Sequence, residues 1–116
     1  RNIEVTIDEQ DIFNVTMNES LAVALLTNLL KNAFVHNIDG GHIRITVTKN
    51  SITFRNSGVK NPLDKEHIFE RFYQGTKKEG STGLGLAIAD SICRLQHLSI
   101  RYYFEQKEHC FEISRQ

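Results

Sequence analysis

The segment ESLAVALLTNLLKNAFV, residues 19–35, decides the fold of this 116-residue chain. Its apolar residues recur at the spacing of one helix face and predict a long amphipathic helix; they are Ala22, Leu26, Leu29, Leu30 and Ala33. Asn18 comes directly before and is a preferred N-cap residue. Asn28 and Asn32, off the apolar stripe, are four residues apart and therefore project from one strip of the helix, with His36 one further turn along.

The same periodicities predict the elements on either side of this helix. They are strands at residues 3–7, 13–17, 43–47, 52–54, 100–104 and 110–113, and a second helix from residue 83 to about residue 96. Strand pairs thus alternate with helices, and we expect hairpins rather than strand-helix-strand crossovers. This order predicts an α+β fold, with a mixed, mainly antiparallel sheet covered on one face by helices.

The composition is that of an ordinary domain, with 40% apolar residues. We expect a single domain over residues 1–116, and we expect it to be part of a longer protein because Met17 is the only methionine. Fourteen basic and 14 acidic residues balance, so no net field favours nucleic acid. No apolar run is long enough to cross a bilayer, and we expect a soluble domain. Cys93 and Cys110 are expected to be packed, reduced thiols, although a disulfide between them stays open.

Two groups of residues could carry chemistry, and each has a plainer alternative. Asn32 could offer its amide oxygen to Mg²⁺, a hard ion that prefers oxygen ligands, or the two asparagines could be a solvated polar face. Gly80, Gly83 and Gly85 flank the start of the second helix, where free N–H groups and the helix dipole favour an anion. The alternative for these glycines is a flexible turn.

The polar stretch from residue 74 to residue 82 predicts a mobile loop. Phe69, Phe72 and Tyr73 precede it and are expected to anchor its base in the core. Lys77 and Lys78 within it could reach a polyphosphate or could simply be solvated.

In this order, the pieces resemble the boxes of the ATP-binding catalytic domain of sensor histidine kinases, in the superfamily shared with gyrase, mismatch-repair ATPases and heat-shock chaperones. Residues 28–33 resemble the asparagine box and residues 56–58 the first glycine box. Residues 68–73 resemble the phenylalanine box and residues 83–88 the second glycine box. Together with their connecting elements, the boxes cover nearly the whole chain.

The resemblance implies a two-layer α/β sandwich that binds Mg·ATP between the two long helices, beneath an ATP lid between the phenylalanine box and the second glycine box. It implies that Asn32 holds Mg²⁺, that Asn28 approaches the phosphates, and that the backbone of residues 83–86 cradles them. The implied nucleotide-binding residues are Asn28, Asn32, His36, Asn56, Gly58, Arg71, Tyr73, Lys77, Lys78, Gly80, Thr82, Gly83, Leu84, Gly85 and Leu86.

Several positions depart from the family pattern. Asn56 stands where an aspartate normally accepts a hydrogen bond from the adenine amino group; its amide still offers one acceptor oxygen, and the lost charge weakens that bond by about 1 kcal/mol. Lys60 replaces a glycine, and Val35 and Gln74 replace common basic residues. We expect a cation to compensate, from Arg71, Lys77 or Lys78.

The implied activity is that of a protein-histidine kinase in a two-component system. Because phosphoryl transfer depends mainly on positioning and charge stabilisation, a domain that presents ATP needs no catalytic residue of its own. The phosphoacceptor histidine is then expected outside this chain, on the protein's own dimerisation helices, and the other implied partner is a response regulator. The full-length protein is expected to be a homodimer anchored in the bacterial inner membrane, with this domain in the cytoplasm. Two alternatives stay open: an anti-sigma-factor type serine kinase and a degenerate docking module without nucleotide.

Overall fold

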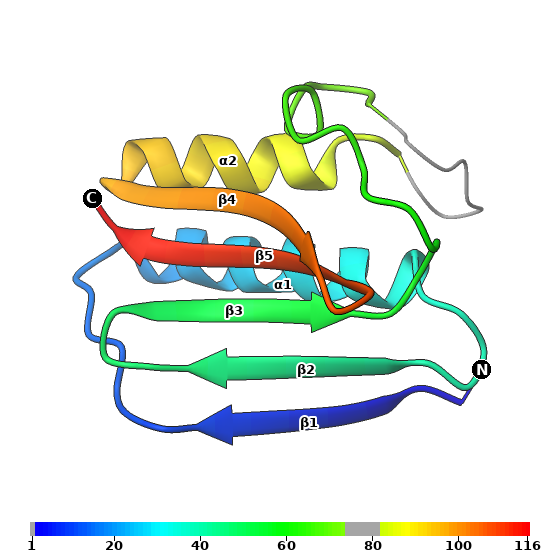
Figure 1. The fold of residues 1–116 in the computed structure, drawn as a ribbon. Coiled ribbons are helices and arrows are strands. Elements are labelled where there is room, and N and C mark those ends of the chain that lie inside the picture. Colours follow the sequence, from blue (N-terminus) through cyan, green and yellow to red (C-terminus); the bar gives the residue numbers. More distant parts are fainter. Residues whose placement is uncertain (1, 74–81) are drawn as a thin grey trace.

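The structure is a computed structural model that describes residues 2–73 and 82–116 (Figure 1). Within those ranges the chain forms one five-stranded sheet and two helices. In chain order the elements are β1 (Glu4–Glu9), α1 (Glu19–Val35), β2 (His42–Val47), β3 (Ser51–Asn56), α2 (Gly85–Leu95), β4 (Leu98–Glu105) and β5 (Glu108–Arg115). Neither helix combines the length and apolar character needed to cross a membrane.

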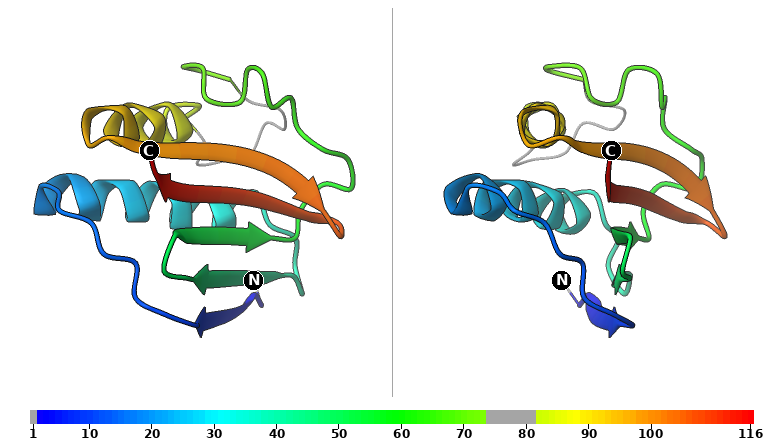
Figure 2. Two further views of the ribbon diagram at one scale, coloured as in Figure 1. Left: turned by 60° about the vertical axis from the view of Figure 1, so that its left-hand side comes forward. Right: turned by 90° about the vertical axis from the view of Figure 1, so that its left-hand side faces the viewer.

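The sheet is mixed and has the strand order β1-β2-β3-β5-β4. β1 runs parallel to β2, and the pairs β2–β3, β3–β5 and β5–β4 are antiparallel. Both helices lie on the same side of the sheet (Figure 2), where α1 packs against β3 and α2 against β4. The predicted fold class, two layers with helices on one face of a mainly antiparallel sheet, is confirmed.

Two predictions about the N-terminal region are wrong. Residues 13–17 form no strand, and α1 is a strand-helix-strand crossover between parallel β1 and β2. Phe13, Val15 and Met17 are partly buried and pack against the core from an extended segment. Their alternation therefore reflects burial of one side of this segment, and not pairing with a neighbouring strand. Arg115 holds this segment by donating to the carbonyl oxygen of Asn14 at 3.1 Å.

The core lies between the helices and the inner face of the sheet. α1 buries Leu25, Leu29 and Ala33, whereas the predicted stripe residue Leu26 is 41% exposed. α2 buries Ala89, Ile92 and Cys93 against the same cluster. Cys93 and Cys110 are both buried free thiols, as predicted, and burial raises the pKa of Cys93 to about 11.

α1 begins as the sequence predicts. The Asn18 side chain accepts a hydrogen bond from the backbone N–H of Leu21 at 3.0 Å, which satisfies one of the donors that a helix start leaves unpaired. The N-terminus of α1 is therefore capped by a side chain of its own chain.

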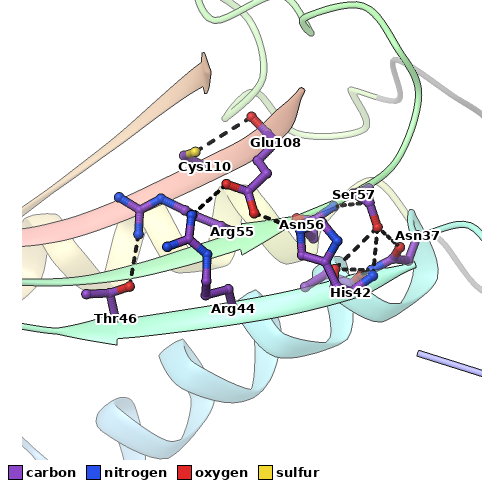
Figure 3. A network of polar contacts seen from close by, with 10 residues as sticks. Asn37, His42, Arg44, Thr46, Arg55, Asn56, Ser57, Glu108 and Cys110 are labelled. Carbon is purple, nitrogen blue, oxygen red and sulfur yellow. Dashed lines mark hydrogen bonds and ion pairs between the residues drawn. The ribbon is translucent and has the colours of Figure 1, made fainter. Parts of the chain in front are cut away.

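On the outer face of the sheet, Glu108 of β5 reaches across β3 to two residues of β2 (Figure 3). Its carboxylate accepts from Arg44 at 2.8 Å and from His42 Nε2 at 2.7 Å. Burial raises the pKa of Glu108, but the hydrogen bonds from Arg44 and His42 outweigh it and leave this pKa below its ordinary value. The carboxylate is therefore ionised near neutral pH and ties β2 to β5.

Glu108→Gln is expected to lower the free energy of unfolding near neutral pH by about 1–3 kcal/mol, because it removes a charged acceptor from two donors. Glu112→Gln is the matched control: Glu112 lies on the same strand and bonds the largely exposed Arg101 at 2.6 Å, a surface pair worth less than about 1 kcal/mol. Because the folded pKa of Glu108 is depressed, its contribution is present above the ordinary pKa of 4.5 and is lost as pH falls through the folded value. Urea unfolding across this range should show the gap between wild type and Glu108→Gln closing with acidification; equal losses for both variants would contradict the role of Glu108.

Candidate functional site

α1 and α2 approach each other at Asn28 and Gly85. The Asn28 amide nitrogen donates to the carbonyl oxygen of Ala24 at 2.8 Å, which fixes the side chain along its own helix. A Cβ atom on residue 85 would lie 3.2 Å from Asn28 Oδ1, closer than an ordinary contact. The tertiary structure therefore brings the asparagine box and the second glycine box together, as the resemblance implies.

The N-terminus of α2 carries no side-chain cap within the described residues. The Thr82 hydroxyl accepts from the N–H of Leu84 at 3.3 Å, and the first helical hydrogen bond runs from Ile88 N–H to the Leu84 carbonyl oxygen. Among residues 2–73 and 82–116, no partner is found for the N–H groups of the first turn, which suits them to a ligand or water. In contrast to the capped start of α1, this end of α2 suits an anion.

The two described segments that border residues 74–81 meet at Phe72 and Gly83. Phe72 N–H donates to the Gly83 carbonyl oxygen at 2.6 Å. Gly83 has φ of +75°, and a Cβ atom there would lie 2.7 Å from Phe72 Cα. Only glycine allows this backbone-to-backbone approach at the start of α2.

The predicted aromatic anchor is correct for two of its three residues. Phe69 packs edge-on against Phe111, with ring centroids 6.2 Å apart, and Tyr73 also packs against the core. Phe72 is 66% exposed and has φ of +64°, so its prediction as a core residue is wrong. The backbone hydrogen bond to Gly83, and not burial of the side chain, holds Phe72 in position.

A second group of candidate residues lies around Asn56, the last residue of β3. Asn56 is 2% exposed, and it faces the helix side because cross-strand partners share a face and its partner in β2 is the buried Ile43. Its Nδ2 donates to the Ser57 carbonyl oxygen at 2.8 Å. Its Oδ1 is the one buried side-chain polar atom in the described residues with no hydrogen-bond partner. A buried acceptor left unpaired is costly, and a ligand donor would satisfy it.

A polar lock holds Asn56 and Gly58 against the end of α1 (Figure 3). Ser57 Oγ donates to Asn37 Oδ1 at 2.6 Å and accepts from His42 N–H at 2.8 Å. A Cβ atom on Gly58 would lie 2.8 Å from the carbonyl oxygen of His36. Asn37 and Ser57 were not predicted from the sequence, although an asparagine just past a predicted helix end often bonds the nearby backbone.

A second group that the sequence analysis missed is the buried pair Tyr102 and His109. The Tyr102 hydroxyl lies 2.8 Å from His109 Nδ1. Burial lowers the pKa of His109, although the hydrogen bond to the Val59 carbonyl oxygen opposes this. The signal in the sequence was the alternation along each strand. The neighbours of both residues face outward, so both residues face the core.

The structure describes some of the other predicted residues and not others. Asn32 is half-buried one turn beyond Asn28, and its backbone carbonyl oxygen accepts from His36 N–H at 3.1 Å. Leu86 is partly buried against the core. The Arg71 guanidinium lies 5.4 Å from the ring centroid of Phe72. Lys77, Lys78 and Gly80 lie outside the described residues.

The arrangement offers three kinds of group. An unpaired acceptor stands at Asn56, amide side chains stand on α1, and N–H groups without a partner among the described residues stand at the start of α2. Such groups suit a ligand that combines a hydrogen-bond donor with a polyanion. Asn32 can supply a neutral oxygen to a divalent cation, which the polyanion and water would complete.

Gly83→Ala is expected to destabilise the chain more than Gly40→Ala. Both glycines have nearly the same positive φ, +75° and +76°, but a Cβ atom at Gly40 meets nothing within 4 Å. The Gly40 variant should cost about 1–2 kcal/mol for the left-handed conformation alone, whereas the Gly83 variant must also separate its backbone from Phe72. Denaturant unfolding, with amide hydrogen exchange at Phe72, measures both effects. Equal destabilisation with unchanged exchange at Phe72 would show that the close approach does not matter.

Comparison with known proteins gives concordant matches. The sequence model of the histidine kinase-, DNA gyrase B-, and HSP90-like ATPases matches residues 17–114. The sensor histidine kinase RppB of Synechocystis is 43% identical over 84 residues, covering 65% of this chain and 18% of that protein. The heme sensor protein HssS of Staphylococcus aureus is 35% identical over 103 residues, covering 84% of this chain and 22% of that protein.

The structural comparison agrees. The catalytic domain of histidine kinase ThkA, in a nucleotide-free form, superposes with a TM-score of 0.80 and 25% identity, covering 96% of this chain and 76% of that chain. This chain therefore spans about three quarters of the solved catalytic-domain chain but less than a quarter of the length of the curated relatives.

Proposed function

This chain belongs to the family of histidine kinase-, DNA gyrase B- and HSP90-like ATPases and is a catalytic domain of the sensor histidine kinase type, and we propose that it binds Mg·ATP between α1 and α2. The observation that carries the proposal is the close approach of Asn28 Oδ1 to Gly85 at the uncapped start of α2. A triphosphate placed there meets free N–H groups and the positive end of a helix dipole.

In this proposal, Asn56 recognises the base of the nucleotide. Its Nδ2 is engaged with the Ser57 carbonyl oxygen, and this bond sets the orientation of the amide. The buried Oδ1 then accepts a hydrogen bond from the 6-amino group of adenine. A base with a 6-oxo group has no donor at that position, so this orientation favours adenine.

The phosphate end uses backbone and amide groups. The N–H groups of Gly85 and Leu86 bind phosphate oxygens, with Gly83 and Leu84 shaping the turn and Asn28 beside them. Asn32 would hold Mg²⁺, which when bound supplies charge neutralisation to the phosphates. Further positive charge comes from Arg71, Lys77 or Lys78.

The remaining predicted residues complete the site in this proposal. His36 and Gly58 form its wall at the end of α1. Tyr73 ends the phenylalanine box, and Gly80 and Thr82 come between it and the second glycine box in the sequence.

In this proposal, residues 1–116 are one catalytic domain that presents the γ-phosphate to a histidine outside the chain. In the described part of the chain, His42 bonds Glu108, His67 bonds Asp64, and His109 is buried beside Tyr102. The acceptor is then a histidine on the dimerisation helices of the same protein, and a response regulator receives the phosphoryl group. The full protein would be a homodimer anchored in the inner membrane, with this domain on the cytoplasmic side.

Asn56→Leu is expected to lower the affinity of this chain for ATP by about tenfold, the value of one buried hydrogen bond to a ligand. It should also abolish the preference for ATP over inosine triphosphate, which has a 6-oxo group in place of the amino group. Titration calorimetry with both nucleotides and Mg²⁺ measures both quantities. The control is Asn14→Leu, at an exposed position before α1, which should change neither. A preference for ATP that survives in Asn56→Leu would contradict the assignment, and wild-type binding no tighter than about millimolar would favour the docking-module alternative.

Asn32→Ala tests the metal end separately. Loss of a metal ligand should lower the affinity for ATP in the presence of Mg²⁺ by about tenfold or more, with no change in the affinity for adenosine, which carries no phosphate. Calorimetry with ATP and with adenosine, each with Mg²⁺ and with a chelator, provides the comparison. Equal losses for ATP and adenosine would show that Asn32 supports the fold and not the metal.

A further inference from the structure

Residues 59–63, which we call the strap, connect Gly58 to the segment that leads to Phe72. A relay of three hydrogen bonds holds the strap in place. His109 Nε2 lies 2.7 Å from the Val59 carbonyl oxygen at the start of the strap. The Leu63 N–H lies 2.9 Å from the Tyr102 hydroxyl at its end. The relay closes inside the core, where the Tyr102 hydroxyl meets His109 Nδ1 at 2.8 Å.

The chemistry of the partners sets the direction of every bond in the relay. A carbonyl oxygen only accepts, so His109 Nε2 carries the proton and donates to Val59. Burial, which lowers the pKa of His109, favours the neutral imidazole at neutral pH. In that form His109 Nδ1 is bare and accepts from the Tyr102 hydroxyl, whose oxygen accepts from Leu63 N–H.

The relay lies directly beside the residues that would recognise the base. His109 is the cross-strand partner of Asn56 in β5, so both side chains face the helix side. A Cβ atom on Gly58 would lie 3.2 Å from His109 Cδ2. The imidazole therefore supports the backbone of Gly58 on one side and borders Asn56 on the other.

Packing alone gives no reason for two polar groups here. The Tyr102 ring lies 5.1 Å from Phe111 and the His109 ring 4.8 Å from Phe104, so phenylalanine at either position could fill an apolar core. A buried polar network stabilises only when all its groups are satisfied, and it then imposes one geometry. The geometry that this network imposes is the path of the strap.

We propose that Tyr102 and His109 are positioning residues for base recognition, which hold the strap and Gly58 so that Asn56 Oδ1 meets the amino group of adenine. The inference rests on the proposed function, since it names residues that support the same nucleotide site. Neither side chain contacts the nucleotide; both act through the strap.

Tyr102→Phe removes the hydroxyl and leaves the ring, so the core keeps its packing. Tyr103→Phe is the matched control, because the same atom is removed one residue along β4, from a side chain on the opposite face that packs with Arg101 at 4.6 Å. The affinities of both variants and wild type for ATP, ADP and inosine triphosphate would be measured by calorimetry, with thermal melting and amide hydrogen exchange at Leu63. His109→Gln, which keeps a donor and an acceptor on one side chain, is the conservative variant.

Tyr102→Phe is expected to lower the affinities for ATP and ADP by the same factor, about three- to tenfold, and to reduce the preference for ATP over inosine triphosphate. Exchange at Leu63 should be faster, and His109→Gln should retain more of the base preference than Tyr102→Phe. Tyr103→Phe should match wild type in all nucleotide measurements. A purely structural role would lower the melting temperature without changing the base preference.

If Tyr102→Phe bound nucleotides with wild-type affinity and preference, this inference would be overturned while the proposed function stood. If wild type itself bound no ATP, both would fail. A fall in ATP affinity alone, with base preference intact and exchange at Leu63 unchanged, would also count against positioning through the strap.

Discussion

The packing of α1 and α2 side by side on one face of the sheet is the constraint on which the candidate site depends. Leu25 and Leu29 of α1 and Ile92 of α2 share one buried cluster with the inner face of the sheet. This apolar contact leaves the polar strip of α1 and the start of α2 next to each other, where Asn28 Oδ1 meets Gly85. The chemistry of the site therefore follows from how the two helices bury their apolar faces.

Polar contacts then determine the irregular segments around that frame. The lock of Ser57 and Asn37 joins the exit of β3 to the end of α1, and Phe72 joins Gly83 backbone to backbone. Each contact gives a hydrogen-bond partner to polar groups that folding removes from water. As a result, the segments that would touch a nucleotide are positioned by hydrogen bonds, whereas the helices and strands beneath them are positioned by apolar burial.

The inner and outer faces of the sheet divide these tasks. The inner face carries the core, the relay of Tyr102 and His109, and the unpaired acceptor of Asn56. The outer face carries the charged bridge of Glu108 to Arg44 and His42, which ties β2 to β5 without entering the site. Because adjacent residues of a strand point to opposite faces, Glu108 and His109 belong to different networks although they are neighbours in sequence.

The sequence by itself determined both helices, the β2–β3 and β4–β5 hairpins, the Asn18 cap and the clustering of Asn28 with Gly85 expected from the family resemblance. These depend on local periodicity, on capping chemistry and on motif order, all of which can be read along the chain. Only the tertiary structure decided that β1 runs parallel to β2, that residues 13–17 lean on the core without pairing, and that Leu25 is buried in place of Leu26. It also decided the partners of His109, whose contact with Val59 joins residues 50 positions apart. Such contacts depend on which faces meet after folding, and a pattern of alternation or helical period is the same whichever partner covers the face.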